Sequence, residues 1–176
     1  MGSSSSSTQI ANRYDVFLSF RGDTRYNFTS HLDSALRKSG LISTFKDENK
    51  FHKGKDKLQK GKDIEKQLME AIEGSRYAVV VLSEEYADSD WCLKELARIV
   101  RCMGDSGRIL PIFYHVNVSH VRNVKSTDVE KQKENRFWKA LEKHAKNPSL
   151  SQYVESWKNA LVKVADQHKD YVTAYT

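Results

Sequence analysis

The sequence predicts an α/β domain with a parallel sheet and helices on both of its faces. Short apolar, β-favouring runs alternate along the chain with stretches whose apolar residues recur at helical spacing. The run YAVVVL at 77–82 is apolar throughout, which is typical of a strand buried on both sides of a parallel sheet. Because parallel strands are joined by right-handed helical crossovers, this alternation predicts a flavodoxin-like three-layer sandwich. We expect a five-stranded parallel sheet in the order 2-1-3-4-5, with a weak fifth strand.

The chain before residue 75 predicts two strands, two helices and a long loop. In chain order these are the strand YDVFLSF at 14–20, a helix from Thr24 to about Lys38, a strand at 41–45, a mobile loop at 46–61 and a helix that Gly74 ends. Thr24 can cap its helix through the side-chain oxygen, and Gly40 can end it because glycine adopts left-handed backbone conformations. The loop is predicted from its content of Lys, Asp, Glu, Asn and Gly.

The rest of the chain predicts two more strands and three helices. They are the strand at 77–82, a helix at 91–103 capped by Ser89 or Asp90, the strand ILPIFY at 109–114, a mostly irregular stretch at 117–135 and amphipathic helices at 137–145 and 153–164. On the helix at 91–103, a rotation of about 100° per residue places Trp91 and Glu95 roughly opposite the core side. The residues expected on the core side are Leu93, Leu96, Ala97 and Val100.

Composition restricts the class of protein. With 176 residues and 39% apolar content, the chain suits one domain at 13–166, with a disordered Ser-rich leader at 1–12 and a C-terminal tail at 167–176. The formal charge of +6 suits phosphate-bearing partners without naming one. No apolar run approaches the ~20 residues of a membrane span, and Cys92 and Cys102 are expected to be reduced thiols. A cytoplasmic or nuclear protein is therefore expected.

The N-terminal sequence MGSSSSST leaves two interpretations open. Gly2 and Ser6 fit the pattern for N-myristoylation, and a flexible serine tail is the alternative. One acyl chain binds membranes marginally, and only Arg13 lies near to assist it. A membrane partner is expected only if Gly2 is myristoylated.

A candidate binding crevice follows from the strand order, because ligands of such sheets bind beyond the carboxyl ends of strands one and three. The residues at those ends are Arg21, Gly22, Asp23, Thr24 and Arg25 on one side, and Ser83, Tyr86, Ser89 and Trp91 on the other, with Glu95 as a further candidate. Arg21 and Arg25 are candidates for binding a pyrophosphate, since guanidinium groups match phosphate oxygens. Surface ion pairs to Asp23 or Asp47 are the alternative.

Trp91 and Glu95 are four positions apart on the predicted helix. There the indole could stack on a flat ring while the carboxylate reaches an adjoining sugar. From the spacing alone, a plainer interpretation is favoured, in which Trp91 fills a gap at the helix start and Glu95 is a solvated surface acid.

Three segments resemble successive signatures of plant TIR (Toll/interleukin-1 receptor) domains, in the family's order over 14–164. They are YDVFLSFRGDTR, LSEEYADSDWCLKEL and ILPIFYHVNVSHVR. The resemblance implies an NAD+ glycohydrolase of plant innate immune signalling, in which the Glu of the WCxxEL segment, Glu95, is catalytic and Trp91 lies at the nicotinamide end. Nicotinamide leaves as a neutral molecule, so a single carboxylate suffices. NAD+ is then the substrate, bound by Arg21, Gly22, Asp23, Thr24, Arg25, Gly61, Ser83 and Trp91, and no cofactor is expected.

Three departures from the family pattern bear on this assignment. The loop after the first strand is one residue shorter than FRGxDT, and the loop before Gly61 carries the extra residues FHKGKDK at 51–57. In the family, that second loop packs against a neighbouring subunit to complete the site. The third departure is FYHVNVSHVR, where the family form is closer to FYDVDPSDVR; His115 and His120 lack further ligands at metal-binding spacing, so no metal is expected.

The resemblance also implies self-association and contact with other TIR proteins or defence signalling complexes. Ser30 and His31 match a pair at the family's interface between the first and last helices, with an ordinary exposed polar pair as the alternative. Trp157 is expected either in that interface or in the core. An adaptor that binds other TIR domains without turnover is the alternative function. Nucleic-acid binding is not expected, because acids dilute the lysines of 46–66 and no stacking aromatics are interleaved.

Overall fold

The computed structural model describes residues 14–39, 44–46 and 57–167. The expectations for the leader at 1–12, the tail beyond 167 and most of the loop at 46–61 lie outside the described residues. The elements, in chain order, are β1 (Tyr14–Ser19), a 3₁₀ turn (Gly22–Thr24), a π-helical turn (Arg25–Thr29), α1 (Ser30–Lys38), β2 (Thr44–Lys46), α2 (Lys57–Glu73), β3 (Ser75–Leu82), the 3₁₀ turn η4 (Tyr86–Asp88), α3 (Asp90–Met103), β4 (Ile109–Phe113), α4 (Val118–Arg122), α5 (Val129–Glu134), α6 (Arg136–Ala145), a 3₁₀ turn (Ser151–Tyr153) and α7 (Val154–Asp166).

The four strands of the described residues form one parallel sheet in the order β2-β1-β3-β4. Leu18 of β1 pairs with Val79 of β3, which pairs with Leu110 of β4. This order confirms the predicted 2-1-3-4 arrangement. The predicted fifth strand does not occur among the described residues, where the chain after β4 is helical.

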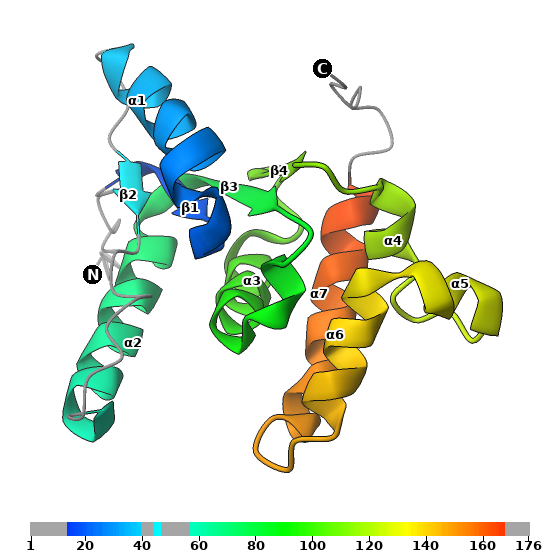
Figure 1. Ribbon diagram of the computed structural model, residues 1–176. Coiled ribbons are helices and arrows are strands. Elements are labelled where there is room, and N and C mark those ends of the chain that lie inside the picture. Colours follow the sequence, from blue (N-terminus) through cyan, green and yellow to red (C-terminus); the bar gives the residue numbers. More distant parts are fainter. Residues whose placement is uncertain (1–13, 40–43, 47–56, 168–176) are drawn as a thin grey trace, which may run out of the picture.

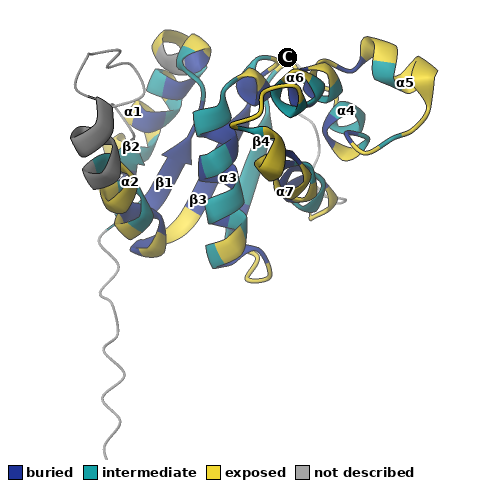
Figure 2. Ribbon diagram, turned by 90° about the horizontal axis from the view of Figure 1, so that it is seen from below, coloured by how far each residue is buried: buried dark blue, intermediate teal, exposed yellow. Residues whose placement is uncertain are grey.

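Helices cover both faces of the sheet (Figure 1). α1 packs on one face, while α2, α3 and α7 pack on the other. Successive β1 side chains point to opposite faces, so that Phe17 enters the larger core with Leu96 and Trp157, and Leu18 enters the smaller core beside Leu32. Figure 2 shows that β1 and most of β3 are buried in the middle of the molecule. The sheet is therefore the middle layer of a three-layer sandwich, as predicted.

The first helix begins later than the sequence predicts. Thr24 does not cap it, because its hydroxyl is buried in the preceding turn, where it donates to the Arg21 carbonyl at 3.0 Å and lies 2.8 Å from the Thr29 hydroxyl. Asn27 has φ −109° and ψ −106°, outside the helical region, so the π-helical turn is itself kinked before α1 begins at Ser30. The helix ends at Lys38, in agreement with the prediction.

Two segments that were predicted as loops contain helices. α2 already begins at Lys57, and α4 and α5 form within 117–135. Asn117 caps α4 by accepting a hydrogen bond from the Ser119 amide at 2.9 Å, and Asp128 caps α5 by accepting one from the Glu130 amide at 3.0 Å. Such caps were the missed signal, because α5 buries no side chain and shows little apolar periodicity.

Both cysteines, Cys92 and Cys102, are free thiols, as the sequence predicts. Within the described residues, no helix is both long and apolar enough to cross a membrane.

Candidate functional site

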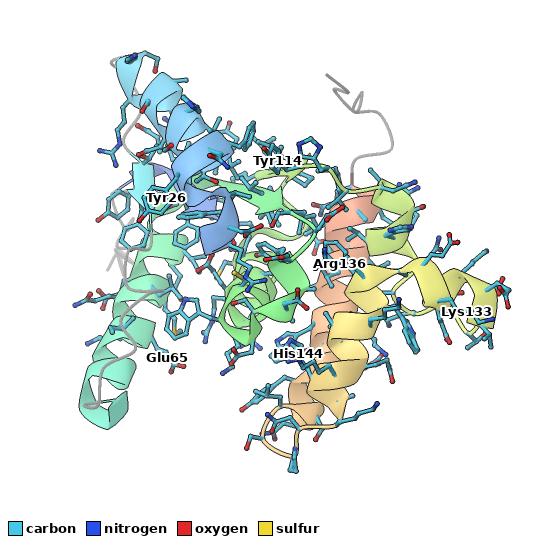
Figure 3. All side chains as sticks on the ribbon, viewed as in Figure 1. Tyr26, Glu65, Tyr114, Lys133, Arg136 and His144 are labelled. Atoms are coloured by element: carbon cyan, nitrogen blue, oxygen red, sulfur yellow. The ribbon has the colours of Figure 1, made fainter. Side chains whose placement is uncertain are left out.

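A cavity of about 50 Å³ lies between α2 and α3. Its α3 wall consists of Trp91, Lys94, Glu95 and Arg98, which recur at i, i+3, i+4 and i+7 and therefore share one side of the helix. Its α2 wall consists of Glu65, Leu68, Met69 and Ile72. Figure 3 shows Glu65 on the side of α2 that faces α3. The cavity thus brings the predicted catalytic residue and the predicted nicotinamide contact together.

Glu95 is buried, with an exposed fraction of 1%. The buried residues of α3 are Cys92, Leu93, Glu95, Leu96, Ile99 and Met103, whereas Ala97 and Val100 are only half-buried. The predicted core side is confirmed, because Leu93 and Leu96 are buried and Ala97 and Val100 pack against the same core. The interpretation of Glu95 as a solvated acid is wrong. The reason is that α2 packs along a flank of α3 that the helical period alone assigns to solvent.

A buried hydrogen-bond chain holds the first turn of α3 against the end of β1. The Tyr86 hydroxyl donates to the Cys92 carbonyl at 3.1 Å and lies 2.7 Å from the Ser19 hydroxyl. Because tyrosine has one hydroxyl proton, Ser19 is the donor to Tyr86. The Ser89 hydroxyl caps α3 by accepting a bond from the Cys92 amide at 3.2 Å, as the sequence predicts. These bonds fix the turn that carries Trp91 relative to the sheet.

Tyr86→Phe tests this chain. Burial raises the pKa of Tyr86 well above its ordinary value, and the nearby Cys92 and Glu95 raise it further. The pKa of Tyr86 is therefore higher in the folded state than in the unfolded state. The neutral hydroxyl stabilises the folded state fully below about pH 10, and this stabilisation is lost as the pH rises above that value. We expect Tyr86→Phe to lower the free energy of unfolding by about 1–3 kcal/mol at neutral pH, and to reduce its decline in alkali.

Urea unfolding of both proteins between about pH 8 and 11 measures this difference. Tyr153→Phe is the matched control, since Tyr153 is 43% exposed. An alkaline decline of equal slope in wild type and Tyr86→Phe would contradict the role given to this hydroxyl.

Arg21, a predicted pyrophosphate contact, lines a different cavity. This polar cleft of about 400 Å³ is formed by Arg21, by Glu85 and Asp88 at the two ends of η4, and by Ala140, Lys143 and His144 of α6. Arg21 donates from Nη1 to the Glu85 carbonyl at 2.8 Å, and lies 3.2 Å from the Glu85 carboxylate and 3.5 Å from that of Asp88. Arg21 thus makes ion pairs, as in the alternative to pyrophosphate binding, but its partners are Glu85 and Asp88 and not Asp23. Asp47 lies outside the described residues.

α6 closes this polar cleft from the other side. Arg136 lies 3.1 Å from the Glu84 carboxylate and 3.8 Å from those of Glu85 and Asp88. His144 of α6 also faces η4, because its Nε2 lies 2.9 Å from the Ala87 carbonyl oxygen. Among the described residues, the polar cleft and the Glu95 cavity have no lining residue in common. The single crevice expected from the strand order is thus divided in two.

The other predicted NAD+-binding residues lie at the ends of β1 and β3 or within α2. The buried Ser83 hydroxyl donates to the exposed Asp23 carboxylate at 3.5 Å, which joins the ends of β1 and β3. Gly22 lies in the same 3₁₀ turn as Thr24 and Asp23. Gly61 lies within α2, and the side chain of Arg25 is outside the described part.

Sequence reasoning did not find Lys94, Arg98 or the α2 wall of the cavity. The spacing of 91, 94, 95 and 98 could have indicated the first two, because these positions share a helix side. No local signal could have indicated that α2 lies opposite them.

The predicted interface pair lies at the start of α1. The Ser30 hydroxyl donates to the Asn27 carbonyl at 3.2 Å, and His31 is exposed. Trp157 is 1% exposed and packs against His144 and Tyr153, with ring centroids 5.6 and 5.9 Å away. Of the two alternatives for Trp157, the structure therefore shows the core position.

Comparisons with known proteins agree with this fold. The model of the family described as TIR domain matches residues 13–174. The chain is 46% identical over 169 residues to disease resistance protein RPV1 of Vitis rotundifolia, covering 93% of this chain and 11% of RPV1. It is 44% identical over 169 residues to TMV resistance protein N of Nicotiana glutinosa, covering 94% of this chain and 13% of that protein.

The chain thus spans roughly a tenth of the length of these relatives. Among solved structures, it is similar to the TIR domains of the activated Roq1 resistosome directly recognizing the pathogen effector XopQ. That match has 41% identity and a TM-score of 0.68, and covers 87% of this chain and 84% of the other. The parallel sheet and the three signature segments, which contain β1, the start of α3 and β4, agree with these matches. The matches show that the chain belongs to the TIR domain family.

Proposed function

We propose that this TIR domain cleaves NAD+ between nicotinamide and ribose, with Glu95 as the catalytic residue, and that it acts in plant innate immune signalling. The observation that carries the proposal is the cavity in which the buried Glu95 lies beside Trp91. The immune role is supported by the relatives, which are disease resistance proteins. NAD+ is the substrate, and the proposed reaction needs no cofactor.

The proposed chemistry needs one carboxylate. The electron pair of the glycosidic bond passes to the cationic ring nitrogen, so that nicotinamide leaves neutral and the ribose becomes oxocarbenium-like. The Glu95 carboxylate stabilises that positive charge, and its effect is larger in a buried site because the local dielectric constant is low. Water then adds to the anomeric carbon, loses a proton and gives ADP-ribose. Attack by a second nucleotide group in place of water gives a cyclic or conjugated product.

Self-association is the second part of the proposal. The TIR domains similar to this chain belong to a resistosome, and the exposed His31 on α1 lies on a surface available to a second copy. The partners are further copies of this domain or other TIR proteins, in the cytoplasm or nucleus. An assembled site would also draw on Gly61 of α2.

The test is nicotinamide release from NAD+ measured against protein concentration. An assembly-dependent enzyme should show turnover that rises faster than linearly with concentration. His31→Ala should shift this rise to higher concentration, whereas Ser34→Ala, an exposed position on the same helix, should not. A strictly linear dependence would contradict assembly, and the absence of release at every concentration would contradict the enzyme.

An adaptor without turnover is the second candidate. The favouring observation is that Arg21 is engaged by Glu85 and Asp88 in a cleft separate from Glu95. The same experiment separates the candidates, because sedimentation would show an adaptor assembling while no nicotinamide is released.

A further inference from the structure

Arg98 is a cation on the same side of α3 as Glu95, one turn further along the helix. It lines the Glu95 cavity and is half-buried. Among the described residues, its guanidinium group makes no hydrogen bond or ion pair, whereas the neighbouring Lys94 lies 3.2 Å from the Asp90 carboxylate. A guanidinium group that is partly withdrawn from water and lacks an acidic partner favours an anionic ligand.

The spacing of Glu95 and Arg98 matches the size of one sugar. Residues three apart on a helix have Cβ atoms roughly 5–6 Å apart. In a nicotinamide nucleotide, one ribose separates the anomeric carbon from the phosphate on its 5′ oxygen. A ribose at the Glu95 carboxylate therefore places that phosphate within reach of the Arg98 side chain.

We infer that Arg98 binds the phosphate attached to the nicotinamide ribose, so that the cavity recognises the nicotinamide mononucleotide half of the substrate. This inference rests on the proposed function, and it transfers the phosphate contact from Arg21 to a residue that shares the cavity with Glu95. Glu65 on the opposite wall keeps the local charge balanced, which limits binding of anions that lack the ring and sugar.

The cavity of about 50 Å³ is smaller than the roughly 300–1,000 Å³ of typical ligand pockets, so the ligand must displace side chains to enter. Met69 and Arg98 are unbranched, and Glu65 is exposed, so these side chains can change rotamer at low cost. The backbone of α3 need not move, because the bonds from Tyr86 and Ser89 anchor its first turn.

The experiment is calorimetric titration of the whole chain with nicotinamide mononucleotide and with nicotinamide riboside, which differ only in the phosphate. Both are measured on the Glu95→Gln background, so that no turnover interferes. We expect the mononucleotide to bind roughly ten- to a hundredfold more tightly than the riboside, because the phosphate gains a charged hydrogen bond. Arg98→Gln should remove this difference. Arg101→Gln is the matched control, since Arg101 is exposed on the same helix and does not line the cavity, and it should retain the difference.

The outcomes separate this inference from the proposed function. Three results would overturn the inference. The first is a preference for the mononucleotide that Arg98→Gln leaves intact. The others are equal affinity for both ligands in the protein that retains Arg98, and no binding of either ligand. An Arg98-dependent preference, together with no nicotinamide release from NAD+ by the protein that retains Glu95, would uphold the inference and defeat the proposed reaction. Inorganic phosphate as a third ligand shows whether the sugar and ring contribute, and binding as tight as that of the mononucleotide would also overturn the inference.

Discussion

Glu95→Gln should lower nicotinamide release from NAD+ by roughly a thousandfold, as expected when the group that stabilises a developing charge is removed. The amide has nearly the same shape as the carboxylate but carries no negative charge to oppose the oxocarbenium ion. Because Glu95 is 1% exposed and packed beside Trp91, an isosteric change disturbs the cavity less than Glu95→Ala does. Steady-state assays at a fixed protein concentration measure the loss.

Glu73→Gln is the matched control, because Glu73 is exposed at the end of α2 and does not line the cavity. It should retain wild-type turnover. Circular dichroism and the midpoint of urea unfolding test whether the Glu95→Gln protein remains folded. Turnover of the folded Glu95→Gln protein at the wild-type rate would exclude Glu95 as the catalytic residue.

Trp157→Ala should lower the free energy of unfolding by about 3–5 kcal/mol. Trp157 is 1% exposed on α7 and contacts the rings of His144 on α6 and Tyr153, so its removal leaves a cavity where α6 and α7 meet. A loss of this size is a large part of the 5–15 kcal/mol that stabilises a typical domain. Denaturant titration followed by far-ultraviolet circular dichroism measures it.

Trp138→Ala provides the comparison, since Trp138 is also a tryptophan but is only half-buried on α6. Its loss should be clearly smaller. If Trp157 instead acted in the self-association interface, Trp157→Ala would weaken assembly while leaving the unfolding of the monomer unchanged, which is the opposite pattern.

Much of the fold follows from the sequence, because each of those elements carries its own local signal. The apolar runs at 14–20, 77–82 and 109–114 become β1, β3 and β4, since such runs are typical of strands in a parallel sheet covered by helices. Ser89 caps α3 where the sequence places the cap. Helix caps are a weaker signal, because a single polar residue before a helix also occurs in loops. The caps Asn117 and Asp128 therefore begin helices in a segment that the sequence predicts to be irregular.

The candidate site divides in the same way. The sequence by itself determined the family, the positions of Trp91 and Glu95 on one helix and their four-residue spacing, since helical geometry depends only on local backbone bonds. Only the tertiary structure decided that Glu95 is buried, that Arg98 lies beside it and that Arg21 belongs to another cleft. The physical reason is that burial depends on which distant segment packs against a helix flank. Here that segment is α2, whose contact with α3 leaves no trace in the periodicity of either helix.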